Sequence, residues 1–442
     1  MAVENKQAGM RRQLGLVSAS AIVVGEVIAV GIFLTPAEMA KSLGSPFWLL
    51  AVWLVMGAVA LSGALSYGEL AARFPEAGGG YVYLREAYGP RIAFLYGWKC
   101  FLVMDPGITA ALAVGLSSYV GYMADLSPTA IKAVAITSIL VIAAINIRGV
   151  RVGASVIKAL TFAKLGLLAV IVVWGLGGRL GDWSNFTPFV DQRAGSSPLP
   201  LALAASLVSA FFSFGGWWDV SKIAGEVREP ARTMPRALAA GVVIVTAVYI
   251  LTSAVFVYLV PMEQATSGET FAAQAGAVLF GERGAQVFSA IVIVSVLGSL
   301  TGIIMTAPRV YYAMARDRLF FKATGRLHPR WSTPARATLL EAALASLLVA
   351  LGTFNQIVAY FIFVTVVFIA LTVASVFVLR RRPSGEAVYR TPGYPVTPAV
   401  FLALAALMLV LFAANRPLQA LAGVGVVLLG LPVYHFAFRK NS

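Results

Sequence analysis

Long apolar stretches, separated by short polar ones, run along most of the chain. Seven of them are residues 46–65, 133–145, 201–214, 237–260, 287–306, 357–379 and 400–413. Each carries enough apolar residues for a helix that crosses a hydrocarbon core of roughly 30 Å. The pattern predicts an all-α integral membrane protein with about twelve transmembrane helices.

Two of the apolar segments are interrupted by glycine in corresponding places. They read GEVIAVGIFLTP at residues 25–36 and FFSFGGWWDVSKIAG at residues 211–225. Paired interruptions five helices apart indicate discontinuous helices, whose freed backbone groups hold a charged solute near the membrane midplane. Close helix packing is the alternative for a single glycine pair, such as Gly298 and Gly302. For matched interruptions we favour a substrate site.

The same spacing divides the chain into two five-helix halves. We expect tails at residues 1–13 and 438–442, five-helix halves at 14–180 and 200–382, and a C-terminal helical hairpin at 397–437. No long linker separates these parts, so one bundle is predicted.

Composition excludes a water-soluble fold. Hydrophobic residues make up 59% of the 442 residues and charged residues 12%, and the mean hydropathy is +0.84. The formal net charge of +15 comes from basic residues that gather after alternate apolar segments. By the positive-inside rule, both termini are cytoplasmic. We expect the protein to lie in the cell inner (cytoplasmic) membrane. Nucleic acid is not an expected partner, because no reading module accompanies the charge.

The sequence gives little support for an enzyme, a metal protein or a channel. The lone Cys100 and the histidines His328 and His435 make no spaced ligand set, so neither a metal nor a cofactor is expected. A polytopic membrane enzyme would need convergent acids, histidines or a known motif. A channel would need charge rings or a filter repeat. We therefore interpret the chain as a carrier.

Several motifs carry a family resemblance over nearly the whole chain. They are GIFLTP (31–36), FSFGGWWD (212–219), EVREPARTMPRAL (226–238), GSLTG (298–302) and PRVYYAMARD (308–317). In these motifs the sequence resembles the amino acid-polyamine-organocation superfamily, and most of all its L-type amino acid transporter branch. The resemblance implies a five-plus-five inverted repeat. It also implies alternating access between a bundle of helices 1, 2, 6 and 7 and a scaffold of helices 3, 4, 8 and 9.

The resemblance also implies the residues that hold the substrate. An amino acid carboxylate would meet the first interruption and its ammonium the carbonyls of the second, and half-helix ends suit both charges. Phe212 corresponds to an aromatic gate. The predicted substrate-binding residues are Ile28, Ala29, Val30, Gly31, Asp105, Phe211, Phe212, Ser213, Gly215, Gly216 and Trp217. The sequence Ala29-Val30-Gly31 departs from the usual Gly-Ser-Gly or Gly-Thr-Gly, and it supplies no hydroxyl.

Lys164 is predicted to lie at membrane depth, where a lysine is costly unless it is paired or functional. It matches a family lysine that stands where sodium-coupled relatives bind a cation, which implies sodium-independent transport. Its expected neighbours are Gly25, Ser295 and Ser299. As a fixed strut it would stay charged, and as a coupling group it would exchange a proton.

Two acids, Asp105 and Glu26, are also predicted at membrane depth. Asp105 would contact a cationic or polar substrate, pair with Lys99 or Lys164, or accept a coupled proton. Glu26 would pair with a scaffold lysine or line the cytoplasmic path. An inner gate of ion pairs, or else a solvated loop face, is expected from Arg228, Arg232, Arg236, Arg309, Glu226, Glu229 and Asp317.

The predicted function is sodium-independent transport of amino acids, as an exchanger or a proton-coupled symporter. Aromatic and apolar site residues favour a neutral substrate. Asp105 and Glu26 leave a cationic amino acid or a polyamine as the alternative. Besides the substrate and the lipid bilayer, a partner subunit stays open.

Overall fold

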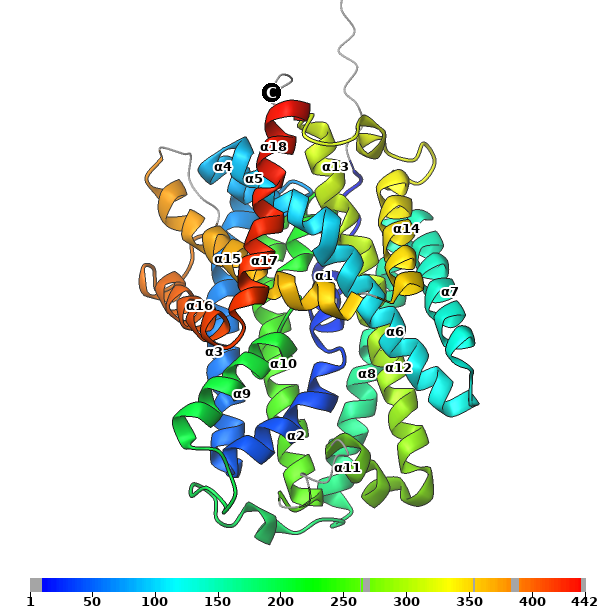
Figure 1. Ribbon diagram of the computed structural model, residues 1–442, viewed down its shortest axis with the longest axis vertical. Coiled ribbons are helices and arrows are strands. Elements are labelled where there is room, and N and C mark those ends of the chain that lie inside the picture. Colours follow the sequence, from blue (N-terminus) through cyan, green and yellow to red (C-terminus); the bar gives the residue numbers. More distant parts are fainter. Residues whose placement is uncertain (1–9, 263, 265–270, 353, 383–388, 439–442) are drawn as a thin grey trace, which may run out of the picture.

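The chain is described by a computed structural model that covers residues 10–262, 264, 271–352, 354–382 and 389–438. The predicted tails at 1–13 and 438–442 fall mostly outside these residues. In the part described, the chain is almost entirely helical (Figure 1).

The α-helices follow one another along the whole chain. They are α1 (Leu16–Val27), α2 (Gly31–Leu43), α3 (Pro46–Arg73), α4 (Gly80–Tyr88), α5 (Pro90–Lys99), α6 (Asp105–Ala124), α7 (Pro128–Ile147), α8 (Val150–Gly177), α9 (Leu199–Ser213), α10 (Pro230–Leu259), α11 (Phe271–Phe280), α12 (Gly284–Thr306), α13 (Pro308–Arg316), α14 (Ala335–Leu351), α15 (Phe354–Arg380), α16 (Val396–Asn415), α17 (Pro417–Leu428) and α18 (Gly430–Val433).

Helices of membrane-spanning length confirm the prediction of an all-α membrane protein. Among the described residues, nine helical stretches are long and apolar enough to cross a bilayer, and the pair α1 and α2, bent by 46°, makes a tenth if it is one span. The helices α9 and α14, of 15 and 17 residues, are shorter. The count of about twelve spans stays a prediction.

Local chemistry explains where several of these helices begin. The hydroxyl of Ser45 accepts a hydrogen bond from the N–H of Trp48, and Pro46 opens α3. Ser127 and Pro128 start α7 in the same way. Serine accepts at the N-cap, and proline at the first helical position gives up an N–H that has no intrahelical partner.

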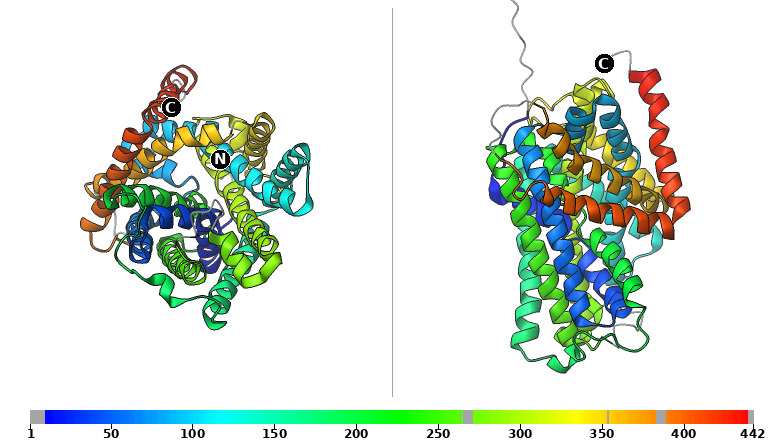
Figure 2. Two further views of the ribbon diagram at one scale, coloured as in Figure 1. Left: turned by 60° about the horizontal axis from the view of Figure 1, so that its bottom comes forward. Right: turned by 90° about the vertical axis from the view of Figure 1, so that its left-hand side faces the viewer.

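The helix α1 lies at the centre of the bundle and packs against α8, α10 and α12 (Figures 1 and 2). Its residues from Ala21 to Val27 are all buried. Small residues let the neighbours approach closely: a Cβ on Gly241 of α10 would lie 2.4 Å from a methyl carbon of Val23. A larger side chain there would push α1 and α10 apart.

Both chain ends lie at one end of the bundle, together with α4 and α13 (Figure 1). We call this end the termini side. The opposite end, the far side, carries α11 and the connection between α8 and α9. The helices α16 and α17 lie along the outer edge of the bundle (Figure 2).

Candidate functional site

The first helix break lies in the middle of the bundle, where α1 ends at Val27 and α2 begins at Gly31. The N–H of Ala29 turns back to the carbonyl of Val27 at 2.9 Å. The N–H of Phe33 donates to the carbonyl of Val30 at 3.1 Å, whereas the N–H groups of Gly31 and Ile32 precede the first helical acceptor. The helix dipole adds positive charge at this end. This end of α2 therefore suits an anion such as a carboxylate.

Lys164 of α8 holds this break in place. Its ammonium donates to the carbonyl oxygens of Gly25, Ile28 and Ser295 at 3.0, 2.6 and 2.8 Å, and the side chain is completely buried. An ammonium has three N–H donors, so all of them are matched. The hydroxyl of Ser299, the third expected neighbour, donates to the same Gly25 carbonyl at 2.7 Å. Lys164 thus ties the broken α1 to α12, and whether it is a fixed strut or exchanges a proton stays a prediction.

The second break follows α9, which ends at Ser213. An irregular stretch leads from there into a 3-10 helix, η3 (Asp219–Glu226). Gly216 has a φ of +107°, which a side chain would strongly disfavour. The last carbonyls of α9 carry the negative end of its dipole, and they suit an ammonium. Two are already used in part: the carbonyl of Phe212 accepts from the N–H of Gly215 at 2.9 Å, and that of Ser213 accepts from Tyr249.

The two breaks are in direct contact. A Cβ on Gly31 would lie 2.9 Å from the Cα of Ser213, so the backbones meet here only because residue 31 is glycine. The hydroxyls of Thr35 and Ser213 are 3.0 Å apart. The N-terminus of one half-helix therefore stands beside the C-terminus of another, and together they offer complementary charge to a zwitterion.

Tyr249 of α10 joins the two breaks, and sequence reasoning missed it. Its hydroxyl lies 3.1 Å from the carbonyl of Val27 and 2.7 Å from the carbonyl of Ser213, and its side chain is fully buried. One hydroxyl proton serves only one of the two carbonyls at a time. No motif or periodicity singled out this tyrosine among the 15 in the chain.

Exposure differs on the two sides of the breaks. Glu26 and Asp219, on the termini side, are 8% and 4% exposed, whereas Ala29 and Val30 are half-buried. Phe212 is 40% exposed, and its ring lies edge-on to Phe412 of α16 with centroids 6.0 Å apart. The side chains just on the termini side of the breaks are thus more buried than those within the breaks.

The remaining predicted substrate-binding residues of the second break differ in how deeply they are buried. Phe211, Gly215 and Gly216 are half-buried around the second break. Trp217 is buried, with its ring edge-on to Tyr67 at 5.1 Å between centroids. It supports the irregular stretch through packing.

Asp105 lies in a buried charge cluster with a partner that the sequence did not indicate. The ammonium of Lys222 is 3.3 Å from Asp105 and 2.7 Å from Asp219, and all three are buried. Tyr311 donates to the other carboxylate oxygen of Asp105 at 3.3 Å. Among the described residues, Asp105 thus pairs with Lys222 and not with Lys99 or Lys164, which was one of its three predicted roles. Lys222 follows an apolar segment as topological basic residues do, but it is an internal cation at a break.

Glu26 also departs from expectation, since its direct partner is a hydroxyl. Thr306 of α12 donates to Oε1 of Glu26 at 3.2 Å. A Cβ on Gly302 would lie 2.4 Å from Cγ of Glu26, so this glycine makes room for the carboxyl group. The described residues show no ion pair between Glu26 and a scaffold lysine.

Several residues of the inner-gate hypothesis form ion pairs on the termini side, and their role as a gate stays a prediction. Arg309 donates to Glu226 at 2.8 Å, and both side chains are 1% exposed. Asp317 pairs instead with Arg85 of α4 at 2.8 Å. Arg232 and Glu229 are 3.9 Å apart and largely solvated, where a pair contributes little.

Tyr81 of α4 adds a neutral contact on the termini side. Its hydroxyl donates to Asp317 at 2.8 Å. Burial, and after it the carboxylate of Asp317, raise the pKa of Tyr81, so the hydroxyl keeps its proton and remains a donor. This contact and the ion pair of Arg85 hold α4 against the C-terminal end of α13.

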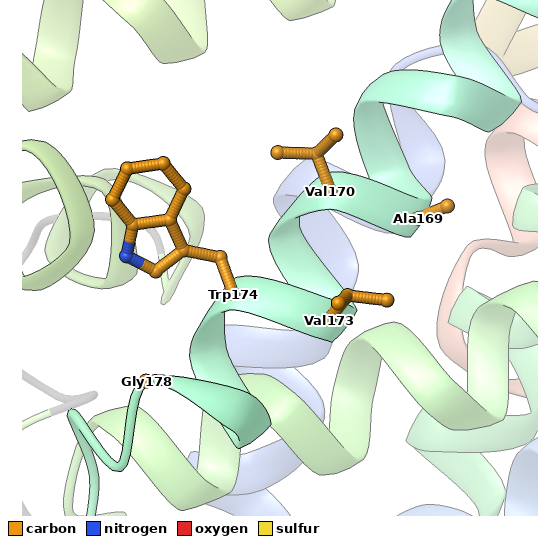
Figure 3. A pocket seen from close by; sticks show the side chains of 5 residues that line it. All are labelled: Ala169, Val170, Val173, Trp174 and Gly178. Carbon is orange, nitrogen blue, oxygen red and sulfur yellow. The ribbon is translucent and has the colours of Figure 1, made fainter.

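A hollow on the outer surface of the bundle is not the site. It is a shallow space of about 570 Å³ on α8, lined by Ala169, Val170, Val173, Trp174 and Gly178 (Figure 3). Trp174 and Val173 are exposed, and the lining is apolar. An apolar hollow on the outside of a spanning helix suits lipid rather than a zwitterion.

A bundle of spanning helices with two adjoining breaks defines a membrane carrier rather than an enzyme. Comparison with known proteins agrees. The family model described as "Amino acid permease" matches residues 14–432. The chain belongs to this family, within the amino acid-polyamine-organocation superfamily and its L-type branch. The resemblance seen in the motifs is confirmed.

Three relatives illustrate the similarity. The serine/threonine exchanger SteT of Bacillus subtilis (strain 168) is 31% identical over 440 residues, which cover 98% of each chain. The b(0,+)-type amino acid transporter 1 of Homo sapiens is 30% identical over 416 residues, 92% of this chain and 84% of that one. The cystine/glutamate transporter of Homo sapiens is 28% identical over 437 residues, 96% of this chain and 85% of that one.

Proposed function

We propose that this protein carries amino acids across the cytoplasmic membrane by alternating access, without sodium. The observation that carries the proposal is the contact between the N-terminal end of α2 and the C-terminal end of α9, at Gly31 and Ser213. These ends match the two charges of an α-amino acid with backbone groups alone. The carboxylate binds at Ala29 to Gly31 and the ammonium at Phe211 to Ser213.

Independence from sodium rests on Lys164. Its ammonium already meets three carbonyl oxygens at the junction of α1 and α12, where a bound cation would need the same oxygens. A second positive charge at that point would be repelled. The lysine therefore does structurally what a bound cation would do.

The substrate is a neutral amino acid. Asp105, the acid that would read a cationic side chain, is paired with Lys222 and has no free charge to offer. The relatives include a serine/threonine exchanger, which supports small neutral substrates. Phe212, partly exposed at the end of α9, gates access from the far side.

Alternating access comes from motion of one group of helices against another. The repeats span residues 14–180 and 200–382, followed by helices at 397–437. The bundle comprises α1 with α2, α3, α9 with η3, and α10. The scaffold comprises α5 with α6, α7, α12 with α13, and α14. The termini side faces the cytoplasm, because the basic residues gather there.

Transport into proteoliposomes tests this function. Labelled serine, threonine, leucine, lysine and putrescine are offered to empty and to preloaded vesicles, with and without sodium. We expect uptake of neutral amino acids that does not change when sodium is removed. Uptake of putrescine or lysine alone, or uptake that requires sodium, would contradict the proposal.

A further inference from the structure

Two buried carboxyl groups share an unusual setting. Glu26 of α1 accepts a hydrogen bond from Thr306 at 3.2 Å, and Glu341 of α14 accepts one from Thr109 of α6 at 3.1 Å. In each, the second carboxyl oxygen is buried and meets no hydrogen-bond partner among the described residues. Neither carboxyl group has a cation in direct contact there.

A buried carboxylate without a cation is costly, by several kcal/mol. Binding a proton removes that cost, since the neutral acid keeps its hydroxyl contact and loses its charge. By contrast, Asp105 and Asp219 each have an ammonium in direct contact, that of Lys222. The unpaired carboxyl oxygens therefore mark where protons reside.

The charged groups on the elements around α1 also leave the carboxyl group of Glu26 without a cation in direct contact. The 3-10 helix η3 presents Asp219 and Lys222, and α6 presents Asp105. From α8, Lys164 is already saturated by three carbonyl oxygens. Among the described residues, α12 and α10 contribute neutral hydroxyls: Thr306 contacts Glu26, and Ser299 and Tyr249 contact the carbonyls of Gly25 and Val27.

Counted together, these acids exceed the available cations. The carboxyl groups of Glu26, Asp105 and Asp219 face Lys222, and Lys99 lies close enough to act on Asp105. Lys99 itself is turned toward the ring of Tyr96, 5.0 Å from its centroid. One of the three acids must be protonated for the buried cluster to be neutral, and Glu26 is the one without an ion pair.

Glu26 lies at a moving boundary, whereas Glu341 does not. Glu26 belongs to α1 of the bundle, and its pocket is formed by Gly302 and Thr306 of α12 in the scaffold. It also adjoins the second break, because a Cβ on Gly216 would lie 3.4 Å from its Cβ. Glu341 and Thr109 both belong to the scaffold.

We propose that Glu26 is a proton-binding site that couples proton movement to substrate transport, through the pocket formed by Gly302 and Thr306. The proposal rests on the proposed function and deepens it. Glu26 takes up a proton on Oε2 while the breaks are open to the far side, and the neutral acid permits closure on the termini side. When α1 leaves α12 on that side, water enters the pocket and the proton is released to it.

The test compares Glu26→Gln with Glu341→Gln in proteoliposomes loaded with a pH-sensitive dye. A mixture of labelled serine, threonine and leucine is offered with an acidic exterior. For one coupled proton, each pH unit supports about tenfold accumulation, so the wild type should accumulate substrate and acidify the interior. Glu26→Gln, fixed in the neutral form, should exchange substrate across preloaded vesicles but lose both accumulation and acidification. Glu341→Gln should retain them.

Three outcomes would overturn the proposal. The first is that Glu26→Gln accumulates substrate as the wild type does. The second is that Glu341→Gln loses accumulation and acidification as fully as Glu26→Gln does. The third needs no variant: a wild type that exchanges amino acids without acidifying the vesicle has no coupled proton, although it remains an amino acid transporter. Absence of any amino acid exchange would overturn the proposed function itself. If Glu26→Gln fails to fold, the dye signal of the wild type still decides.

Discussion

At the scale of single residues, the site depends on a few side chains that serve backbone carbonyls. Lys164 is the clearest case, because three buried carbonyl oxygens converge on its ammonium. Thr161, one turn earlier on α8, makes a single neutral bond to the carbonyl of Ala21 at 3.0 Å. The two residues therefore form a matched pair for comparing a strut with an ordinary tether.

Lys164→Met should abolish most transport. Hydrogen bonds from a charged donor contribute about 1.5–3 kcal/mol each, so their loss should lower turnover by at least about tenfold. Thr161→Val should lose one neutral hydrogen bond, which contributes about 1 kcal/mol to stability, and should keep most of the transport activity. Uptake rates at equal amounts of folded protein measure both, and wild-type rates in Lys164→Met would remove the strut from the mechanism.

Gly31 is the residue that lets the breaks touch. A methyl group there would meet the Cα of Ser213 at 2.9 Å, and overpacking of this kind costs about 1–3 kcal/mol. Gly31→Ala should impair amino acid uptake severalfold. Gly166→Ala, on α8 with nothing within 4 Å of the added carbon, should have no effect. Equal uptake by the two variants would argue against the close approach as a functional feature.

Phe212 is only partly buried, so it contributes less to the packing of the fold than a fully buried phenylalanine does. Because its side chain is 40% exposed, Phe212→Ala should change the melting temperature in detergent little, while it slows transport severalfold. Phe214→Ala, close by in the chain but 2% exposed, should lower stability instead. A Phe212→Ala variant whose stability falls as much as its transport rate would show a packing role and not a gate.

At the scale of elements, Tyr249 links two half-helices through one hydroxyl. Tyr249→Phe removes that proton and preserves the ring, so transport should fall about fivefold for a loss of about 1 kcal/mol. Tyr258→Phe, on the same helix but packed against Trp183 at the far side, is the control. If both variants transport alike, the bridge has no role in coupling the breaks.

Hydropathy predicted the elements well because lipid imposes one rule on every span: backbone groups must be satisfied within the helix. Each of the seven apolar stretches lies almost entirely within a helix, and both glycine-marked interruptions fall at helix breaks. The breaks were predictable because glycine interruptions in corresponding segments of two halves are typical of discontinuous helices that line a site.

Partners across the bundle were not predictable in the same way. Lys222 follows an apolar segment, as topological lysines do, and only the turn of η3 directs it back to Asp105. Thr306 and Gly302 became the pocket of Glu26 through packing between α1 and α12. Such contacts join residues far apart in sequence, and neither periodicity nor spacing encodes them.

At the scale of the whole molecule, buried ion pairs lie on the termini side of the two breaks. The buried pair of Arg309 and Glu226 and the pair of Lys222 and Asp105 both join the proposed scaffold to η3. Breaking them should be required for the site to open on that side. The pairs therefore belong to one of two end states of the transport cycle.

Binding of the substrate between the two breaks is the step on which the proposed function depends. The chain allows it to be probed by thiol labelling, because it has a single cysteine, buried Cys100. With Cys100 replaced by alanine, Ala29→Cys places a thiol in the first break, and Asp191→Cys places one on the exposed connection between α8 and α9.

The rate of labelling by a small thiol reagent is measured with and without a transported amino acid. We expect the amino acid to slow labelling at position 29 severalfold and to leave position 191 unchanged. Equal labelling of position 29 at saturating amino acid would contradict the site.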